Sequence, residues 1–127
     1  MTIFIIGAGF TGMQLAKMLV LERNKVVLID NDAEKVRHAS DELDCTVLEA
    51  DGNSIDVLEQ AGIASANAFV ALTGDDEVNM IACQLVDSAY PDILKIARVR
   101  NYAYYSAVDS ARRFQKMYGI AERKNLQ

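Results

Sequence analysis

The chain has 127 residues, 51% of them hydrophobic, and it carries a net charge of −5 at neutral pH. This length fits one domain with a substantial core, and it is too short for a cofactor domain together with a substrate domain. The acidic balance argues against general nucleic-acid binding, and no apolar run approaches the roughly 18 residues needed to span a bilayer.

The chain opens with the pattern of a strand, a glycine-rich turn and a helix. Residues 3–6 are a continuous apolar run typical of a buried strand. This run begins so near the first residue that we expect no signal peptide before it. Residues 11–23 have the pattern of a helix, and the turn between the two elements reads Gly7-Ala8-Gly9-Phe10-Thr11-Gly12.

The glycines of this turn have separate roles in holding a dinucleotide. Gly7 permits the tight turn, Gly9 lets the backbone approach a pyrophosphate, and Gly12 lets the helix pack closely on the strand. The free N–H groups and the dipole at the helix N-terminus supply an anion site. We therefore expect the whole turn to bind a cofactor; the alternative is a turn that only packs an α/β unit.

An acidic residue closes the second predicted strand, residues 26–29. Asp30 lies 18 residues after Gly12, where a carboxylate can accept hydrogen bonds from ribose hydroxyls. The same carboxylate repels a ribose 2′-phosphate, and the neighbouring Asn31 offers no positive charge to offset that repulsion. The pattern therefore predicts a bound adenine nucleotide and favours NAD(H) over NADP(H).

Strands and helices alternate through the following residues. Asn31 or Asp32 is predicted to cap a helix that reaches Leu43, and a short helix from about residue 54 is predicted to end near Gly62. The remaining predicted strands cover residues 45–48, 68–72 and 93–99. A helix after Gly74 is predicted to bury one side formed by Val78, Ile81, Ala82, Leu85, Val86 and Ala89. A last helix is predicted over residues 102–118.

This alternation with short connections predicts an α/β fold, a doubly wound Rossmann-type parallel sheet in a single domain. A sixth strand would follow Gly119 in such a sheet. The residues at 121–125 are too polar for a buried strand, so the sixth strand is doubtful.

Polar residues follow three further predicted strands, at the sheet edge where open α/β folds bind ligands. Asp51, Gly52 and Asn53 could contact an adenine or form an Asx turn. Thr73 or Asp75 is predicted to cap the next helix, with ligand contact by Thr73 and Gly74 in addition. Ligand contacts are also predicted for Asp75, Glu77 and Arg98.

No catalytic residues are predicted. His38 stands alone on a predicted helix, and Cys45 and Cys83 lack metal-ligand spacing, so we expect reduced, buried thiols. A metal site at residues 75–77 is disfavoured because consecutive helical side chains do not converge on one point.

These segments together resemble the RCK N-terminal domain (KTN or TrkA-N), the cytosolic nucleotide-binding module of potassium channels and transporters. The resemblance covers residues 2–100, from the glycine turn and the Val-Leu-Ile-Asp run at 27–30 onward. Its most specific parts are Thr-x-x-Asp-Glu-x-Asn at 73–79 and Ala-Arg-Val-Arg at 97–100. The family also has a C-terminal RCK subdomain, and we expect residues 1–127 to form the NAD-binding N-terminal domain without it.

The resemblance implies a regulator and not an enzyme. Such a protein is cytoplasmic, peripheral at the inner face of the cell membrane, and couples nucleotide state to potassium flux through a membrane-embedded transporter or channel subunit. Family members use NAD(H), ATP or ADP, and ATP-switched relatives often have arginine at the position of Phe10. NAD(H) is therefore favoured, with ATP/ADP as the alternative ligand and a small NAD-dependent oxidoreductase fragment as the alternative function.

We also predict a homo-oligomer. Residues 1–92 carry 5 basic and 16 acidic side chains, whereas residues 93–127 carry 8 basic and 2 acidic ones. A helix at a sheet edge buries only one face, so part of the last predicted helix should contact another chain. The groups expected there are Tyr102, Tyr104, Tyr105, Phe114, Met117 and Tyr118, flanked by Arg112, Arg113 and Lys116. The alternative is a helix that folds back on its own sheet.

Overall fold

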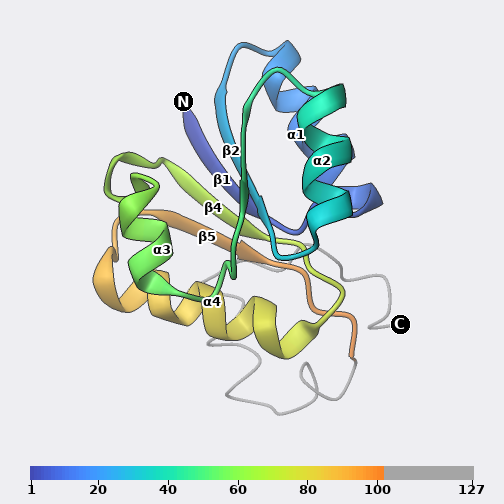
Figure 1. The fold of residues 1–127 in the computed structure, drawn as a ribbon. Coiled ribbons are helices and arrows are strands. Elements are labelled where there is room, and N and C mark those ends of the chain that lie inside the picture. The colour runs from blue at the N-terminus through green and yellow to red at the C-terminus, as the bar shows by residue number, and fades with distance from the viewer. Residues whose placement is uncertain (102–127) are drawn as a thin grey trace.

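A five-stranded parallel sheet forms the centre of the protein, with helices on both faces (Figure 1). The computed structural model describes residues 1–101. The strands are β1 (Thr2–Ile6), β2 (Lys25–Asp30), β3 (Thr46–Glu49), β4 (Ala68–Ala71) and β5 (Leu94–Ala97). The helices are α1 (Phe10–Leu21), α2 (Ala33–Glu42), α3 (Ile55–Gln60), the 3-10 turn η1 (Ile63–Ser65) and α4 (Asp76–Ala89). The predicted doubly wound α/β fold is confirmed.

Two apolar layers sandwich the sheet because successive strand residues point to opposite faces. In β1, Ile3 and Ile5 belong to the layer under α1 and α2, whereas Phe4 and Ile6 belong to the layer under α3 and α4. All four β4 residues are buried, as expected of a parallel strand covered on both faces. The continuous apolar runs in the sequence therefore reflect burial on two sides.

Helix ends follow the local sequence signals. The Asp32 carboxylate caps α2 by accepting hydrogen bonds from the backbone N–H of Glu34 and of Lys35. Ser54 caps α3, and Gly62 follows the end of that helix with a φ of +95°, which L side chains rarely adopt. The predicted caps at residue 32 and near residue 62 are confirmed.

The buried face of α4 differs from the prediction. Its buried residues are Asn79, Ala82, Cys83 and Val86, while Ile81 and Leu85 are exposed to 50% and 36%. Ala89, also predicted to be buried, is exposed. The helix is rotated relative to the apolar pattern because the Asn79 side chain hydrogen-bonds inward to Thr73 and Arg98. The inner face of α4 therefore includes the polar residue Asn79, while the apolar residues Ile81 and Leu85 lie on the exposed side.

The strand order is β3-β2-β1-β4-β5, so the chain runs outward in one direction from β1 and then in the other from β4. β5 is shorter than predicted because its partner β4 ends at Ala71, opposite Ala97. The predicted last helix, its interface and the doubtful sixth strand lie outside the described residues. Within residues 1–101, no helix has the length and apolar character needed to cross a membrane.

Candidate functional site

A cavity of about 590 Å³ opens at the carboxyl edge of the sheet, between β1 and β4, where the direction in which successive strands are added to the sheet reverses. This reversal point is where open α/β sheets bind ligands. Most predicted site residues line the cavity: Gly7, Gly9, Phe10, Thr11, Asp30, Asn31, Asp51, Gly52, Asn53, Thr73, Gly74, Asp75 and Arg98. Three predicted residues lie outside its lining: Ala8, Gly12 and Glu77.

The glycine turn needs its glycines for three different reasons. Gly7 has a φ of +106°, and a Cβ there would meet the Leu72 backbone. A Cβ on Gly12 would collide with the Gly7 carbonyl, so Gly12 allows α1 to start close to β1. Gly9 has no atom near its missing Cβ and faces the cavity. Only Gly9 therefore leaves space that a ligand can use.

The N-terminus of α1 opens toward this space. Gly9 is the N-cap of α1 and has no side chain to accept from the first-turn N–H groups. Those N–H groups and the helix dipole favour an anion. Phe10, the next residue, is 81% exposed at the rim of the cavity.

Asp30 ties the end of β2 to the glycine turn. Its Oδ2 accepts a hydrogen bond of 2.7 Å from the backbone N–H of Ala8, and its Oδ1 accepts one of 2.8 Å from the N–H of Asp32. Both carboxylate oxygens are therefore bonded to the protein's own backbone. The Ala8 N–H finds no partner in its own turn, so the carboxylate holds the turn in shape before any ligand arrives.

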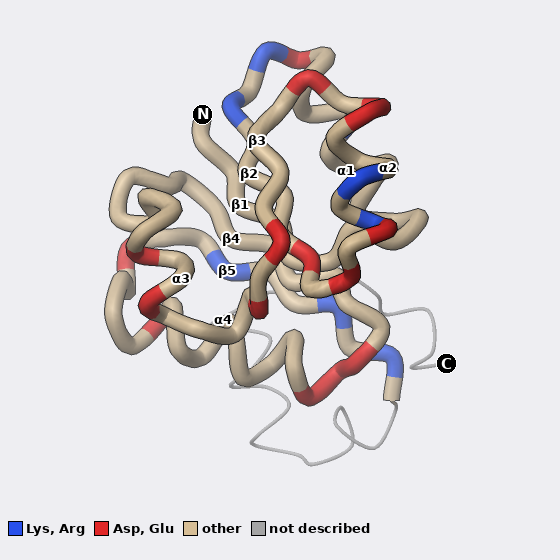
Figure 2. Tube along the Cα trace, in the orientation of Figure 1, with Lys and Arg blue, Asp and Glu red and all other residues tan. Residues whose placement is uncertain are grey.

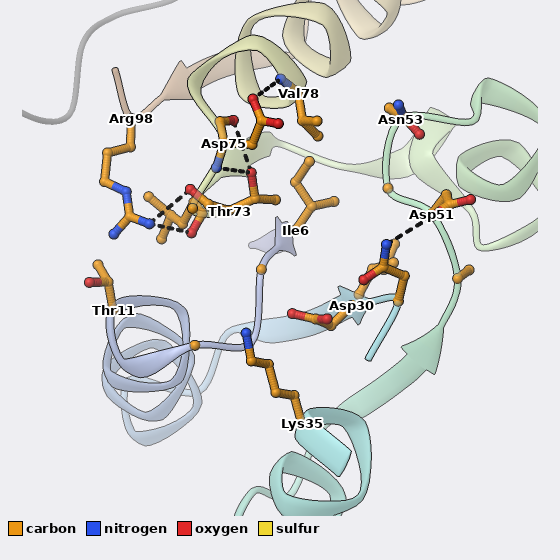
Figure 3. A pocket seen from close by; sticks show the side chains of 18 of the residues that line it. Ile6, Thr11, Asp30, Lys35, Asp51, Asn53, Thr73, Asp75, Val78 and Arg98 are labelled. Atoms are coloured by element: carbon orange, nitrogen blue, oxygen red, sulfur yellow. Dashed lines mark hydrogen bonds between the residues drawn. The ribbon is translucent and has the colours of Figure 1, made fainter. Parts of the chain in front are cut away.

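The loops after β2 and β3 form the opposite wall. The Asn31 amide donates a 3.1 Å hydrogen bond to the Asp51 carboxylate. A Cβ on Gly52 would collide with the Ile6 side chain, so this loop lies directly against the end of β1 (Figure 3). Asn53 completes the lining on this side.

The loop between β4 and α4 is held by a buried amide. Asn79 is fully buried, and its Oδ1 accepts from the Thr73 N–H at 2.9 Å and the Thr73 hydroxyl at 2.6 Å. Its Nδ2 donates to the Thr73 carbonyl at 3.0 Å and the Arg98 carbonyl at 2.9 Å. The Thr-x-x-Asp-Glu-x-Asn pattern included this residue, but spacing alone gave it no role. Asn79 thus joins the cavity loop to the end of β5.

Two charged side chains reinforce that link. The Arg98 guanidinium, 6% exposed, donates through Nη2 to the carbonyls of Leu72 and Thr73, each at 2.8 Å (Figure 3). The Asp76 carboxylate accepts from the N–H groups of Arg100 and Asn101 at 2.9 and 2.7 Å. The chain leaving β5 is therefore bonded to the start of α4.

The acidic residues at the start of α4 act on backbone groups. Asp75 caps the helix, accepting from the N–H groups of Glu77 and Val78, which confirms the capping prediction. Within residues 1–101, no cluster of three or more metal-binding side chains occurs. Glu77 lines a shallower hollow beside the main cavity.

Lys35 is a cavity residue that the sequence reasoning missed. It belongs to the first turn of α2, and its side chain reaches across to the glycine turn (Figure 3). A basic residue five positions after the strand-ending acid is the signal that could have identified it. The lining then contains three acidic residues, Asp30, Asp51 and Asp75, and three basic ones, Lys35, Arg98 and Arg100. Along the chain trace, acidic and basic positions occur together near the start of α4 and the end of β5 (Figure 2).

The two thiols lie away from this cavity. Burial raises the pKa of the Cys83 thiol to about 12, and the pKa of the half-buried Cys45 is also raised, chiefly by burial. Both cysteines are free, as predicted, although only Cys83 is fully buried. Raised pKa values keep them protonated, so neither is an activated nucleophile.

Comparisons with known proteins identify the family. The family model for the TrkA-N domain matches residues 3–117. The Trk system potassium uptake protein TrkA of Halomonas elongata is 42% identical over 104 residues, 82% of this chain and 23% of that protein. A TrkA homolog from Pyrococcus horikoshii is 41% identical over 99 residues, 78% of this chain and 43% of that protein. The chain thus spans less than half the length of these relatives.

Solved structures share the fold at low identity. The AMP-bound Kef CTD of Shewanella denitrificans has a TM-score of 0.77 at 17% identity, covering 97% of this chain and 72% of that one. The NAD(P)-binding domain of an exopolyphosphatase-related protein from Archaeoglobus fulgidus has a TM-score of 0.74 at 23% identity, covering 86% and 80%. Because the family model matches most of its length, the chain belongs to the TrkA-N domain family.

Proposed function

We propose that the protein is a nucleotide-sensing regulatory domain of a potassium uptake or channel system, and that it binds NAD(H) in the cavity at the sheet edge. The observation that carries this proposal is the 2.7 Å bond between Asp30 and the glycine turn beside an open helix N-terminus. In a chain of the TrkA-N family, this arrangement supports a role for Asp30 as ribose acceptor and for the neighbouring helix N-terminus as pyrophosphate site.

NAD(H) is preferred to ATP/ADP because the α1 N-terminus carries Phe10 where a phosphate-binding arginine would stand. Phe10 is exposed and adds no donor for terminal phosphates. The alternative ligand, ATP or ADP, draws support from the AMP-bound form of the Kef neighbour, since a mononucleotide occupies that related fold.

Ligand state reaches the rest of the protein through the loop between β4 and α4. A nucleotide that contacts Thr73 or Gly74 would act on a loop already bonded to residues 98–101 through Asn79, Arg98 and Asp76. Coupling requires that the ligand favour one arrangement of this linkage over another. The partner would be a membrane-embedded potassium transporter or channel subunit, with the domain cytoplasmic, peripheral at the membrane and part of a homo-oligomer.

The function proposed is regulatory and not enzymatic. A small NAD-dependent oxidoreductase fragment is the alternative, and distant structural neighbours at under 25% identity include a sugar-nucleotide dehydrogenase and two UDP-glucose 4-epimerases. It would require an acid/base pair near the nicotinamide. Turnover of NADH with carbonyl substrates by this chain would favour that alternative.

Calorimetric titration with NADH, NAD⁺, ATP and ADP tests the proposal directly. We expect NADH and NAD⁺ to bind more tightly than ATP and ADP, because Phe10 offers no donor to the terminal phosphates of ATP and ADP. Tighter binding of ATP than of NADH would contradict the proposed ligand and support the alternative, a regulator switched by ATP and ADP. The absence of binding by all four at millimolar concentration would leave a domain that has kept the fold without the ligand.

Asp30→Ala should weaken every adenine nucleotide by about 1–3 kcal/mol, the range for hydrogen bonds to charged groups. It should also lower the free energy of unfolding by about 1 kcal/mol, because the Ala8 N–H loses its acceptor. Calorimetry and urea unfolding measure the two effects. Asp41→Ala, an exposed acid on α2 outside the cavity, is the matched control. Unchanged affinity in Asp30→Ala would remove Asp30 from the site.

A further inference from the structure

A second hollow, of about 290 Å³, lies between α1 and α2 and adjoins the proposed nucleotide cavity. The two spaces share Gly9, Phe10 and Lys35 in their linings, so they meet at the glycine turn. A group attached to a ribose at Asp30 and directed toward α2 would enter this hollow. The nucleotide cavity therefore continues into this hollow past the glycine turn and Lys35.

Positive charge is concentrated at this hollow. Residues 1–92 contain five basic side chains, and two of them, Lys17 and Lys35, line it from α1 and α2. Glu42 is the one acidic residue in the lining. The surrounding sequence is otherwise strongly acidic, so a pair of lysines facing one space marks a place for an anion.

The Lys35 ammonium is available to a ligand. Figure 3 shows its side chain extending from α2 toward the glycine turn, on the same side of the cavity as Asp30. Among residues 1–101, none forms an ion pair with Lys35. Its backbone N–H is already used by the Asp32 cap, which fixes the helical turn from which the side chain projects.

Asp30 opposes a ribose phosphate less than its charge suggests. Each of its carboxylate oxygens already accepts a backbone N–H, from Ala8 at 2.7 Å and from Asp32 at 2.8 Å. Those donors offset part of the negative charge. The preference for NAD(H) over NADP(H) rested on a missing positive charge beside Asp30, and the structure supplies one from the first turn of the next helix.

We propose that Lys35 is a specificity-determining residue that lets the site accept a phosphate ester on the adenosine ribose. The ligand class is an adenine dinucleotide with a 2′-phosphate, NADP(H), bound alongside NAD(H). The phosphate would lie at the mouth of the α1–α2 hollow. Lys35, which lines both spaces, would contact it directly, and Lys17, which lines only the hollow, would contribute less. The inference rests on the proposed function, since it places this phosphate relative to a nucleotide in the main cavity.

The test measures the dissociation constants of NAD⁺ and NADP⁺ by calorimetry in the same buffer. We expect NADP⁺ to bind the unchanged protein within about tenfold of NAD⁺, and Lys35→Met to raise that ratio by about tenfold, the effect of one charge-assisted contact. Lys17→Met should raise it less. Arg37→Met, an exposed basic residue on the same helix outside both linings, should leave the ratio unchanged. Methionine keeps the helix propensity of lysine, so the variants should fold.

The outcomes separate this inference from the function on which it rests. NAD⁺ binding with NADP⁺ more than about a hundredfold weaker, or a ratio that Lys35→Met leaves unchanged, would overturn the role of Lys35 alone. Failure of both dinucleotides to bind would overturn the proposed function and this inference together. If Arg37→Met raised the ratio of the NADP⁺ to the NAD⁺ dissociation constant as much as Lys35→Met does, the effect would come from general surface charge. That result would overturn the specific role of Lys35.

Discussion

Gly9→Val should abolish nucleotide binding while the domain stays folded. No atom lies within contact of the missing Cβ in the protein itself, so a side chain there meets no protein group. The same side chain would project into the cavity beside the α1 N-terminus, where a pyrophosphate must approach the backbone. Calorimetry with NADH should show no measurable heat of binding, and circular dichroism should match that of the unchanged protein.

Gly12→Val is the matched comparison, because it alters a glycine of the same turn for a different reason. Its Cβ would collide with the Gly7 carbonyl, so the expected result is loss of the folded domain itself. Retention of tight NADH binding by Gly9→Val would show that the turn does not hold phosphate. A folded, stable Gly12→Val would contradict the close contact between α1 and β1.

Asn79→Leu should lower the free energy of unfolding by about 3–5 kcal/mol. Leucine has a similar branched shape but a larger volume, and it leaves the Thr73 N–H and the Arg98 carbonyl without the amide partner that Asn79 provides. The Thr73 carbonyl keeps its hydrogen bond from the Arg98 guanidinium. Each buried polar group left unsatisfied costs about 1–3 kcal/mol. Urea unfolding followed by circular dichroism measures the change.

Gln84→Leu is the control for Asn79→Leu, since it alters an exposed amide on the same helix. Its effect should stay within about 0.5 kcal/mol, as for most surface substitutions. An equally small effect in Asn79→Leu would mean that water or relaxed geometry replaces the amide. The loop between β4 and α4 would then lack the buried anchor described above.

The fold could be predicted from sequence because its signals are local. A buried parallel strand such as β4 is a continuous apolar run, and the turn after β1 contains glycines where the backbone needs them. Helix caps are equally local, since Asp32 and Asp75 bond to N–H groups two and three residues away. Such features need no knowledge of distant contacts.

What sequence reasoning missed depends on partners distant in sequence. The inner face of α4 follows Asn79, whose bond to Arg98 spans 19 residues, and apolar counting treats Asn79 as a surface residue. Asp30 bonds Ala8 across 22 residues, which spacing cannot reveal. The spacing of Lys35 after Asp30 is visible in the sequence, but its entry into the cavity also depends on how α2 packs beside the glycine turn.

The position of β1 has a consequence for how the protein is made. Of the five described strands, β1 is synthesised first, yet it is the central strand of the sheet, paired with β2 on one side and with β4 on the other. Its pairing of Ile3 with Ala68 closes only after the residues between them have been made. Until then one edge of an apolar strand stays open, which is a condition for aggregation and slow, non-local folding. A nascent chain stalled before β4 would therefore expose the unpaired edge of β1 in a sheet of three strands. We expect chaperones to bind such a chain.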